Sequence, residues 1–278
     1  MSDFTYVFFG CGNMGNAVLE GGIKSGILSK ETAIIVSKSV KTADSFKIKG
    51  YKSYSGDEYP EILSTLESLK KCVWLICVKP QVFDEFCKTI STHKFEPTLI
   101  ISVMAGITIS SIKEKLSATC PSSTPVARLM PNVACAIGAG VTSFAHEGCS
   151  AESIEIARRL AGGMGICEEI NEKLMDAASV VAGSSPAFAF MFMEALADGA
   201  VATGMPRAQA LRLAAATMMG SAKLVLESGE HPGQLKDKVC SPGGTTIEGV
   251  RLLERQGLRS SVIEAVCATF AKNKTFQK

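Results

Sequence analysis

The sequence predicts an α/β protein in two parts: a mostly parallel sheet with helices, followed by a part made only of helices. Up to about residue 170, short apolar segments rich in β-formers alternate with helical stretches, which is typical of a parallel sheet. After Asn171 no strand candidate remains, and apolar residues recur at helical spacing. A chain of 278 residues is long enough to form two cores. We therefore expect one domain over residues 1–170 and a second over residues 171–278.

A glycine-rich turn follows the first predicted strand, residues 6–9, and opens a helix. It has the pattern G-x-G-x-x-G, and the residues assigned to it are Gly10, Cys11, Gly12, Asn13, Met14 and Gly15. The first glycine makes a tight turn, the second lets the backbone approach a pyrophosphate, and the third lets the helix pack against the strand. The first domain is therefore predicted to be a Rossmann-type domain that binds NAD or NADP. A purely structural glycine turn is the alternative.

The second predicted strand, residues 32–36, is followed by residues that favour a phosphorylated cofactor. NAD sites usually place Asp or Glu here to bind the ribose 2′-hydroxyl, whereas this chain reads Ser37-Lys38-Ser39-Val40-Lys41. Lysines and hydroxyls can donate charge-assisted hydrogen bonds to a 2′-phosphate. We assign Ser37 and Lys38 to the cofactor and expect NADPH, with NADH as a second cofactor that the site can accept. The alternative is that Lys38 and Lys41 are ordinary surface charges.

Four further strands are predicted at residues 73–78, 98–103, 125–129 and 141–144. In an open α/β sheet, ligands lie beyond the carboxyl ends of the strands. The residues assigned to the cofactor at two of these ends are Val78, Lys79, Pro80, Met104, Ala105 and Gly106. Lys79 can equally be a solvated loop lysine.

Three helices of the second domain are predicted at residues 177–203, 208–226 and 260–270. Ser184-Ser185-Pro186 is expected to supply a cap and a first-turn proline. The segment 188–197 is apolar nearly all round, so one face is expected to meet a second copy of the chain in a homodimer. A buried core helix in a monomer is the alternative.

Another glycine turn, Ser241-Pro242-Gly243-Gly244-Thr245-Thr246, precedes a periodic helix. The first N–H groups of a helix have no intrahelical partner and carry partial positive charge. Several of these groups would therefore point toward one spot, which suits a small anion such as a carboxylate. By itself this pattern is more often structural than functional.

The composition excludes several classes of partner. A net charge of +2, with 20% charged residues, gives no basic field for nucleic acid. The N-terminus carries Asp3 and lacks the basic and apolar segments of a signal or transit peptide. Glu194 and Asp198 interrupt the longest apolar run, so we expect no membrane-spanning segment.

The cysteines and histidines do not indicate a metal site or a disulfide framework. There are ten cysteines but no C-x-x-C, and His93, His146 and His231 are far apart in the sequence. We expect free thiols in a reducing compartment, no metal, and a cytoplasmic location.

The motifs together resemble those of the pyrroline-5-carboxylate reductases, over nearly the whole chain. The matching segments are Phe9-Gly10-Cys11-Gly12-Asn13-Met14-Gly15, Val78-Lys79-Pro80, Ala105-Gly106-Ile107-Thr108, Met130-Pro131-Asn132, Gly183-Ser184-Ser185-Pro186-Ala187, Glu194-Ala195-Leu196-Ala197-Asp198, His231-Pro232-Gly233-Gln234-Leu235 and residues 241–246. The resemblance implies NAD(P)H-dependent reduction of 1-pyrroline-5-carboxylate to L-proline, the last step of proline biosynthesis, by hydride transfer to a cyclic iminium. It also implies a helical domain that interlocks two subunits, with dimers often assembled into a decamer.

The resemblance also assigns roles to residues. It implies that the Thr246 hydroxyl hydrogen-bonds the ring nitrogen of the substrate and is catalytic. The substrate carboxylate is expected to be bound by Ser241, Gly243, Gly244, Thr245 and Thr246. Glu172 matches a family position near the substrate, although its own pattern indicates a first-turn helix acid. Lys238 and Asp57 depart from the Asn that many relatives carry, so those two contacts are open.

Other classes of enzyme fit less well. A β-hydroxyacid dehydrogenase needs a helical-domain Lys with a nearby Asn, and there is no Asn between Glu172 and Lys272. A short-chain dehydrogenase needs Tyr-x-x-x-Lys, which is absent from this sequence. Two alternatives stay open: an imine reductase for another cyclic amino acid, and a non-enzymatic dimer that senses NADP.

Overall fold

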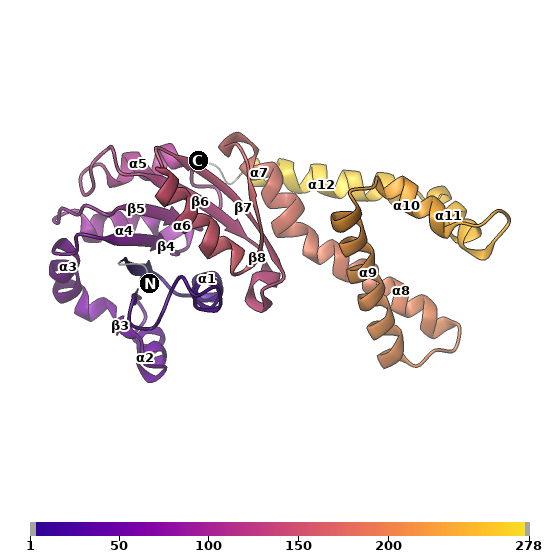
Figure 1. Ribbon diagram of the computed structural model, residues 1–278, viewed down its shortest axis with the longest axis horizontal. Helices are drawn as coiled ribbons and strands as arrows, with labels where there is room; N and C mark the ends of the chain where they lie inside the picture. Colours follow the sequence, from indigo (N-terminus) through magenta and orange to yellow (C-terminus); the bar gives the residue numbers. More distant parts are fainter. Residues whose placement is uncertain (1–3, 276–278) are drawn as a thin grey trace. The chain divides into compact units, whose positions relative to one another are not determined.

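The computed structural model describes residues 4–275, and within them it contains one eight-stranded sheet (Figure 1). The expectation that the chain has no leader peptide rests partly on Asp3, which lies outside the described residues. The elements up to the last strand are β1 (Thr5–Phe9), α1 (Asn13–Lys24), β2 (Ala33–Val36), α2 (Val40–Ile48), β3 (Lys52–Tyr54), η1 (Gly56–Glu58), α3 (Tyr59–Glu67), β4 (Cys72–Ile76), η2 (Pro80–Val82), α4 (Phe83–Ile90), β5 (Leu99–Ser102), α5 (Ile109–Leu116), β6 (Val126–Pro131), η3 (Val133–Ile137), β7 (Gly140–Glu147), α6 (Ala151–Gly162) and β8 (Gly165–Glu169).

The strand order is β3-β2-β1-β4-β5-β6-β7-β8, and every pair is parallel except β6 with β7. The prediction of a mostly parallel sheet is therefore confirmed, as are the six predicted strands. From β1 the chain passes first to β2 on one side and later to β4 on the other. This reversal makes the carboxyl ends of β1, β2 and β4 a topological switch point, where such sheets bind ligands.

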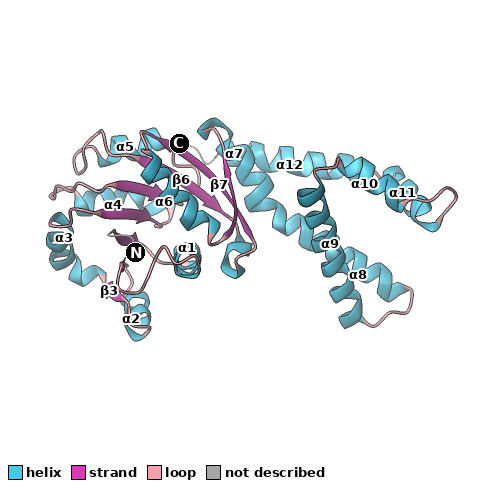
Figure 2. Cartoon of the chain, in the orientation of Figure 1, coloured by secondary structure: helices cyan, strands magenta, loops and turns pink. Residues whose placement is uncertain are grey.

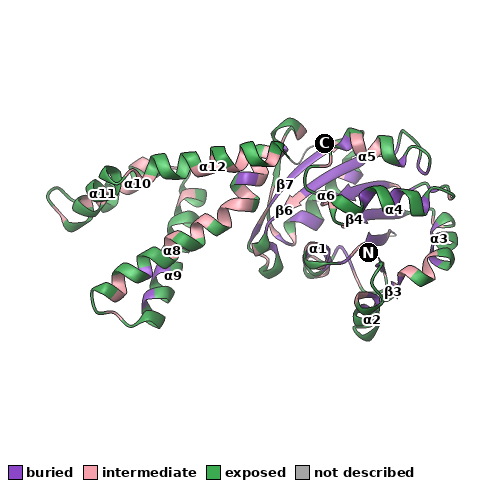
Figure 3. Cartoon of the chain, turned by 180° about the vertical axis from the view of Figure 1, so that it is seen from behind, coloured by how far each residue is buried: buried purple, intermediate pink, exposed green. Residues whose placement is uncertain are grey.

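The core lies on both faces of the sheet, because a parallel sheet is covered by helices on each side. Along β1, Tyr6 and Phe8 pack in the cluster that contains residues of α1 and α6, whereas Val7 and Phe9 pack with residues of α3, α4 and α5. The Phe9 and Trp74 rings meet edge to face with centroids 4.8 Å apart. Figure 3 shows the strands as the buried part of this unit. The packed strands give the switch point a rigid base.

Strands β3 and β8 were not predicted from the sequence. Both lie at an edge of the sheet, and both are short and rich in polar residues, with Lys52 and Ser53 in β3 and Glu168 and Glu169 in β8. An edge strand pairs on one side only and has no need of a continuous apolar run. Their sequences therefore lack the pattern that reveals a buried strand.

The chain divides into two compact units. One contains the described residues up to Gly183 and those from Lys272 onward, and the other contains residues from Ser184 to Ala271. The division falls inside a helical stretch made of η4 (Glu172–Leu174), α7 (Met175–Ala178), a π-helical turn η5 (Ser179–Ser184) and α8 (Ser185–Ala202). The domain boundary after residue 170 stays a prediction.

The second unit contains only helices in the described chain (Figure 2): α8, α9 (Arg207–Ser228), α10 (Pro232–Val239), α11 (Thr245–Arg255) and most of α12 (Leu258–Lys274). The three predicted helices correspond to α8, α9 and α12. Of the segment expected to supply a cap and a first-turn proline, Pro186 does lie in the first turn of α8, whereas Ser184 has helical dihedral angles and its side chain accepts no capping hydrogen bond.

Pro186 has no N–H to donate to the carbonyl of Ala182, four residues earlier. Instead Asn132 Nδ2 donates to that carbonyl at 3.0 Å. Pro186 lies in the first turn of α8, and a side chain of the sheet unit satisfies the carbonyl that the proline cannot reach.

Helix α8 exposes large apolar side chains, including Phe190 (61% exposed) and Met191 (69%). Among the described residues, one helical stretch, Glu172–Ala202, is long and apolar enough to cross a membrane, judged by its 31 residues and composition alone. Glu194 and Asp198 lie in the last third of this stretch, and the expectation that no segment spans a membrane stays a prediction. A helix that packs against protein passes the same test.

Candidate active site

The glycine-rich turn after β1 has the geometry that a bound pyrophosphate requires. Gly10 adopts φ +82°, and a Cβ there would lie 3.1 Å from the carbonyl oxygen of Cys77. An added Cβ on Gly12 would meet nothing within 4 Å, so the backbone is open to a ligand. A Cβ on Gly15 would lie 2.8 Å from the Gly10 carbonyl, so only glycine lets α1 pack this closely. The first turn of α1 has no acidic residue and no side-chain cap, which leaves its N–H groups available to an anion.

A hollow of about 610 Å³ lies beside this turn. This volume is in the range of small-molecule sites. It is lined by Gly10, Cys11, Gly12, Ser37, Lys38, Ser39, Thr42, Gly56, Asp57, Tyr59, Cys77, Val78, Lys79, Val82, Glu85, Phe86 and Thr89. All of these belong to the sheet unit, at or beyond the carboxyl ends of β1, β2, β3 and β4. The residues present therefore fit a dinucleotide.

The hollow brings together only part of the predicted cofactor set. Gly10, Cys11, Gly12, Ser37, Lys38, Val78 and Lys79 line it, whereas Asn13, Met14, Gly15, Pro80, Met104, Ala105 and Gly106 do not. The last three follow β5: Met104 is buried, and Ala105 and Gly106 form an exposed turn. Their contacts with a cofactor stay predictions.

The loop after β2 is ordered by its own hydroxyls. The Ser39 N–H donates to Ser37 Oγ at 3.3 Å, and Ser39 Oγ in turn accepts the Thr42 N–H at the start of α2. Lys38 between them extends to Glu85 on α4, with Nζ and Oε1 2.7 Å apart. Of the two lysines considered from the sequence, Lys38 lines the hollow and Lys41 does not.

Two acidic residues line the hollow, and one of them, Glu85, was missed from the sequence. Asp57, which the resemblance had already singled out, comes from the turn after β3. Glu85 lies 47 residues from Lys38 along the chain, in the first turn of the helix that follows β4. Residues 37–41 after β2 contain no acid, but the fold brings these two carboxylates to the same hollow.

The second glycine turn lies in the helical unit. Gly243 adopts φ +68°, the Gly244 N–H donates to the Ser241 carbonyl at 3.0 Å, and α11 begins at Thr245. No side chain caps this helix. Within residues 4–275 the exposed hydroxyls of Thr245 and Thr246 have no hydrogen-bond partner. Uncapped N–H groups and free hydroxyls together suit a carboxylate with a polar atom beside it.

Lys238, which precedes this turn, pairs with Glu230, their Nζ and Oε2 atoms being 2.6 Å apart. Both residues are in the helical unit, at the two ends of α10. The positive charge of Lys238, which stands where an Asn was expected from the resemblance, is thus balanced by the Glu230 carboxylate.

Glu172 belongs to the sheet unit, where it is partly exposed and forms an ion pair with the buried Arg128. Its Oε1 accepts Arg128 Nη1 at 2.9 Å and the N–H of Ile109, the first residue of α5, at 2.7 Å. The Arg128 side chain is only 4% exposed, and its Nε and Nη2 have no partner among the described residues. Arg128 was not singled out from the sequence, although an arginine within an apolar strand is a signal. A substrate contact of Glu172 stays a prediction.

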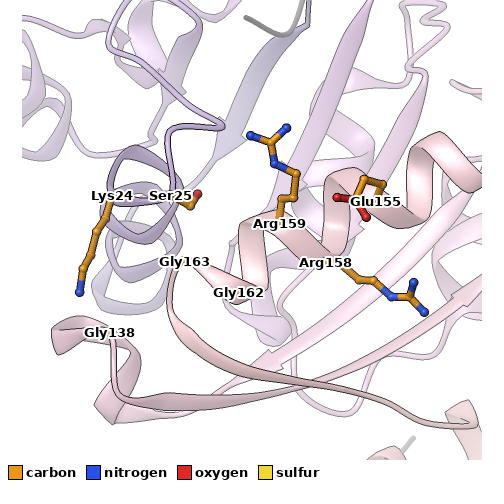
Figure 4. A pocket seen from close by; sticks show the side chains of 8 residues that line it. All are labelled: Lys24, Ser25, Gly138, Glu155, Arg158, Arg159, Gly162 and Gly163. Atoms are coloured by element: carbon orange, nitrogen blue, oxygen red, sulfur yellow. The ribbon is translucent and has the colours of Figure 1, made fainter.

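A second hollow, of about 590 Å³, lies where α1 and α6 end (Figure 4). In the picture the side chains of Lys24, Arg158 and Arg159 point away from one another, and Arg158 pairs with Glu169. Basic residues in the last turn of a helix stabilise its negative end. This hollow therefore has a structural explanation and is not the candidate site.

The thiol of Cys11 in the glycine-rich turn is not a nucleophile at neutral pH. Burial raises the pKa of Cys11 to about 12. Among residues 4–275, no group of three His, Cys, Asp or Glu side chains is placed to hold a metal ion.

Comparisons with known proteins match both units. The family model described as pyrroline-5-carboxylate reductase dimerisation matches residues 172–276, and the one described as NADP oxidoreductase, coenzyme F420-dependent, matches residues 5–106. The putative pyrroline-5-carboxylate reductase 4 of Caenorhabditis elegans is 42% identical over 96% of this chain and 91% of its own length. The pyrroline-5-carboxylate reductase of Escherichia coli K12 is 39% identical over 98% and 97%.

Solved structures give the same result. The pyrroline-5-carboxylate reductase of Coxiella burnetii superposes with a TM-score of 0.82, at 27% identity, covering 99% of this chain and 98% of that one. The Plasmodium falciparum pyrroline carboxylate reductase, solved with NADP bound, has a TM-score of 0.78 at 26% identity and covers 100% of both chains.

Proposed function

Because this chain belongs to the pyrroline-5-carboxylate reductase family, we propose which of its residues bind the cofactor and the substrate of that reaction. The chain is an oxidoreductase that reduces 1-pyrroline-5-carboxylate to L-proline with NAD(P)H, the last step of proline biosynthesis. The observation that best supports this function is that the chain is 39% to 42% identical in sequence to such reductases over nearly their full length.

NADP is the cofactor. We propose that Gly10, Gly12 and the first turn of α1 bind its pyrophosphate, since the turn is open there and uncapped. We propose that Ser37 and Lys38 bind the 2′-phosphate and that Val78 and Lys79 bind the adjacent ribose of the cofactor. When bound, NADPH supplies the hydride, and the protein supplies the geometry.

The substrate is a cyclic imine that carries a carboxylate. We propose that Ser241 and the N–H groups of residues 243–246 bind the carboxylate, and that the Thr246 hydroxyl hydrogen-bonds the ring nitrogen. Such an imine protonates readily, so a dedicated strong acid is unnecessary. Holding the ring in a reactive orientation then provides much of the rate enhancement.

Glu172 is retained as a predicted substrate residue. Its two short hydrogen bonds support a further role, which is to fix the start of α5 and therefore the preceding turn at Ala105 and Gly106. In this role Glu172 positions residues that we assign to the cofactor.

The protein is a homo-oligomer. We propose a dimer assembled into a decamer, with the exposed apolar side chains of α8 covered by a second copy and not by lipid. We also propose that the enzyme is cytoplasmic. Light scattering on the purified protein would give the number of subunits directly.

The assay that tests this function follows oxidation of NADPH and NADH in the presence of 1-pyrroline-5-carboxylate or its six-membered ring analogue. We expect turnover of the five-membered substrate with both cofactors and faster turnover with NADPH. Turnover of the larger ring alone would favour an imine reductase for another cyclic amino acid. NADPH binding without any turnover would favour the sensing alternative.

A further inference from the structure

Glu85 lies beside Lys38, the lysine that is proposed above to bind the 2′-phosphate. It lies in the first turn of α4 and lines the same hollow as Lys38. Lys38 Nζ and Glu85 Oε1 are 2.7 Å apart, and the two side chains are 79% and 59% exposed. The lysine proposed to recognise the phosphate is therefore already paired with a carboxylate of its own chain.

The hollow as a whole has no excess of positive charge. Its charged side chains are Lys38, Lys79, Asp57 and Glu85, two of each sign. Neutral donors remain near the phosphate position, namely the hydroxyls of Ser37, Ser39 and Thr42 at the start of α2. These donors allow a 2′-phosphate to bind, but they add no net attraction for it.

We propose that Glu85 is a specificity-determining residue that lowers the preference of this enzyme for NADPH over NADH. The inference depends on the proposed role of Lys38. To bind the 2′-phosphate, Lys38 must leave Glu85, and the freed carboxylate then faces the phosphate charge at short range. NADH has no phosphate at this position and leaves the Lys38–Glu85 pair intact. Glu85 therefore weakens the binding of NADPH and leaves the binding of NADH nearly unaffected.

The test measures kcat/KM for NADPH and NADH in the full-length enzyme carrying Glu85→Gln. We expect the NADPH to NADH ratio to rise about two- to fivefold, the scale of an exposed ion pair. The effect should shrink at high salt, because exposed charges are screened. A ratio that does not change would overturn the proposal.

Asp84→Asn is the matched control. Asp84 precedes Glu85 on α4 and carries the same charge, but it pairs with Lys115 and does not line the hollow. It should leave the ratio unchanged. An equal rise in both variants would show a general effect of net charge and would also contradict the proposal.

Lys38→Gln separates failure of this inference from failure of the proposed cofactor site. If Lys38→Gln weakens NADPH more than NADH while Glu85→Gln changes nothing, only the role of Glu85 is wrong. If Lys38→Gln weakens both cofactors equally, the role of Lys38 is wrong and the inference is overturned with it. In the Lys38→Gln background, Glu85→Gln should still raise the ratio, because the carboxylate repels the phosphate whether or not Lys38 is charged.

Discussion

At the level of single residues, Thr246 is the residue to which we assign the catalytic hydrogen bond, and among the described residues no neighbouring side chain holds its hydroxyl. Its hydroxyl is exposed and has no hydrogen-bond partner in the described chain, so it is free to bind the ring nitrogen. Its position in the first turn of α11 is fixed by the Ser241–Gly244 backbone hydrogen bond. Substitution at Thr246 should therefore alter the reaction and leave the fold intact.

We predict that Thr246→Ala lowers turnover by about one to two orders of magnitude, equivalent to about 1.4 to 2.7 kcal/mol. The physical reason is loss of a hydrogen bond to the reacting ring, while NADPH affinity should be nearly unchanged. Thr246→Ser keeps the hydroxyl and should recover most of the rate. Steady-state kinetics and cofactor titration measure both quantities, and full activity of Thr246→Ala would remove this residue from the mechanism.

Two glycines of the cofactor turn should respond differently to the same substitution. Gly12→Ala meets no atom of the protein and should leave stability nearly unchanged, but its methyl group should weaken NADPH binding at least tenfold. Gly15→Ala forces α1 away from the Gly10 carbonyl, which should cost about 1 to 3 kcal/mol of stability. Thermal unfolding and NADPH titration of both variants would test this. Equal losses of stability would contradict it.

At the scale of elements, the Arg128–Glu172 pair joins strand β6, the start of helix α5 and the turn η4. The N–H of Ile109 is at the positive end of α5, so the Glu172 carboxylate is stabilised by the helix and by the guanidinium. Arg128 is buried, and two of its donor atoms have no partner among the described residues. The Glu172 carboxylate therefore balances the positive charge of Arg128. Such a pair holds elements in place more than it adds net stability.

We predict that Glu172→Ala destabilises the protein by about 2 to 3 kcal/mol, because it leaves the Arg128 charge buried alone. Glu172 is partly exposed, so the loss should fall below that of a fully buried pair. The double variant Arg128→Met/Glu172→Ala removes both charges and should be more stable than Glu172→Ala. Denaturant unfolding at fixed subunit concentration measures the difference, and an additive double-mutant cycle would contradict the coupling.

At the scale of the whole molecule, the helical unit has a very small core of its own. Its buried cluster consists of Ala197, Ala210 and Ala214, whereas large apolar side chains such as Phe190 and Met191 are exposed. A unit of this composition gains most of its stability from what covers it. We propose that association of subunits supplies that cover, which agrees with the match of residues 172–276 to the dimerisation family model.

We predict that Phe190→Glu reduces the oligomer to smaller species, because a charge would have to be buried without a partner. Ile48→Glu is the control, since Ile48 is 88% exposed on α2 of the sheet unit. It should leave the mass unchanged. Light scattering after gel filtration measures both variants, and an intact oligomer in Phe190→Glu would place the interface elsewhere.

The local features of this protein can be predicted from its amino-acid sequence alone. Six strands, the order of sheet and helices, and the two glycine turns follow from short-range apolar periods and from glycine positions, which depend on neighbouring residues only. The edge strands β3 and β8 could not be predicted from local patterns, because they are formed by pairing with strands elsewhere in the chain. The same holds for the helical turn at Ser184, which is next to a contact with the Asn132 side chain.

Contacts between side chains that are distant in the sequence became known from the folded chain. Glu85 reaches Lys38 across 47 residues, and Arg128 reaches Glu172 across 44. These contacts depend on the strand order and on which face of the sheet each helix covers. Both are set by the collective packing of the core, and no local pattern records them. For this reason the segment after the second strand indicated no acid beside Lys38, while the folded chain places Glu85 there.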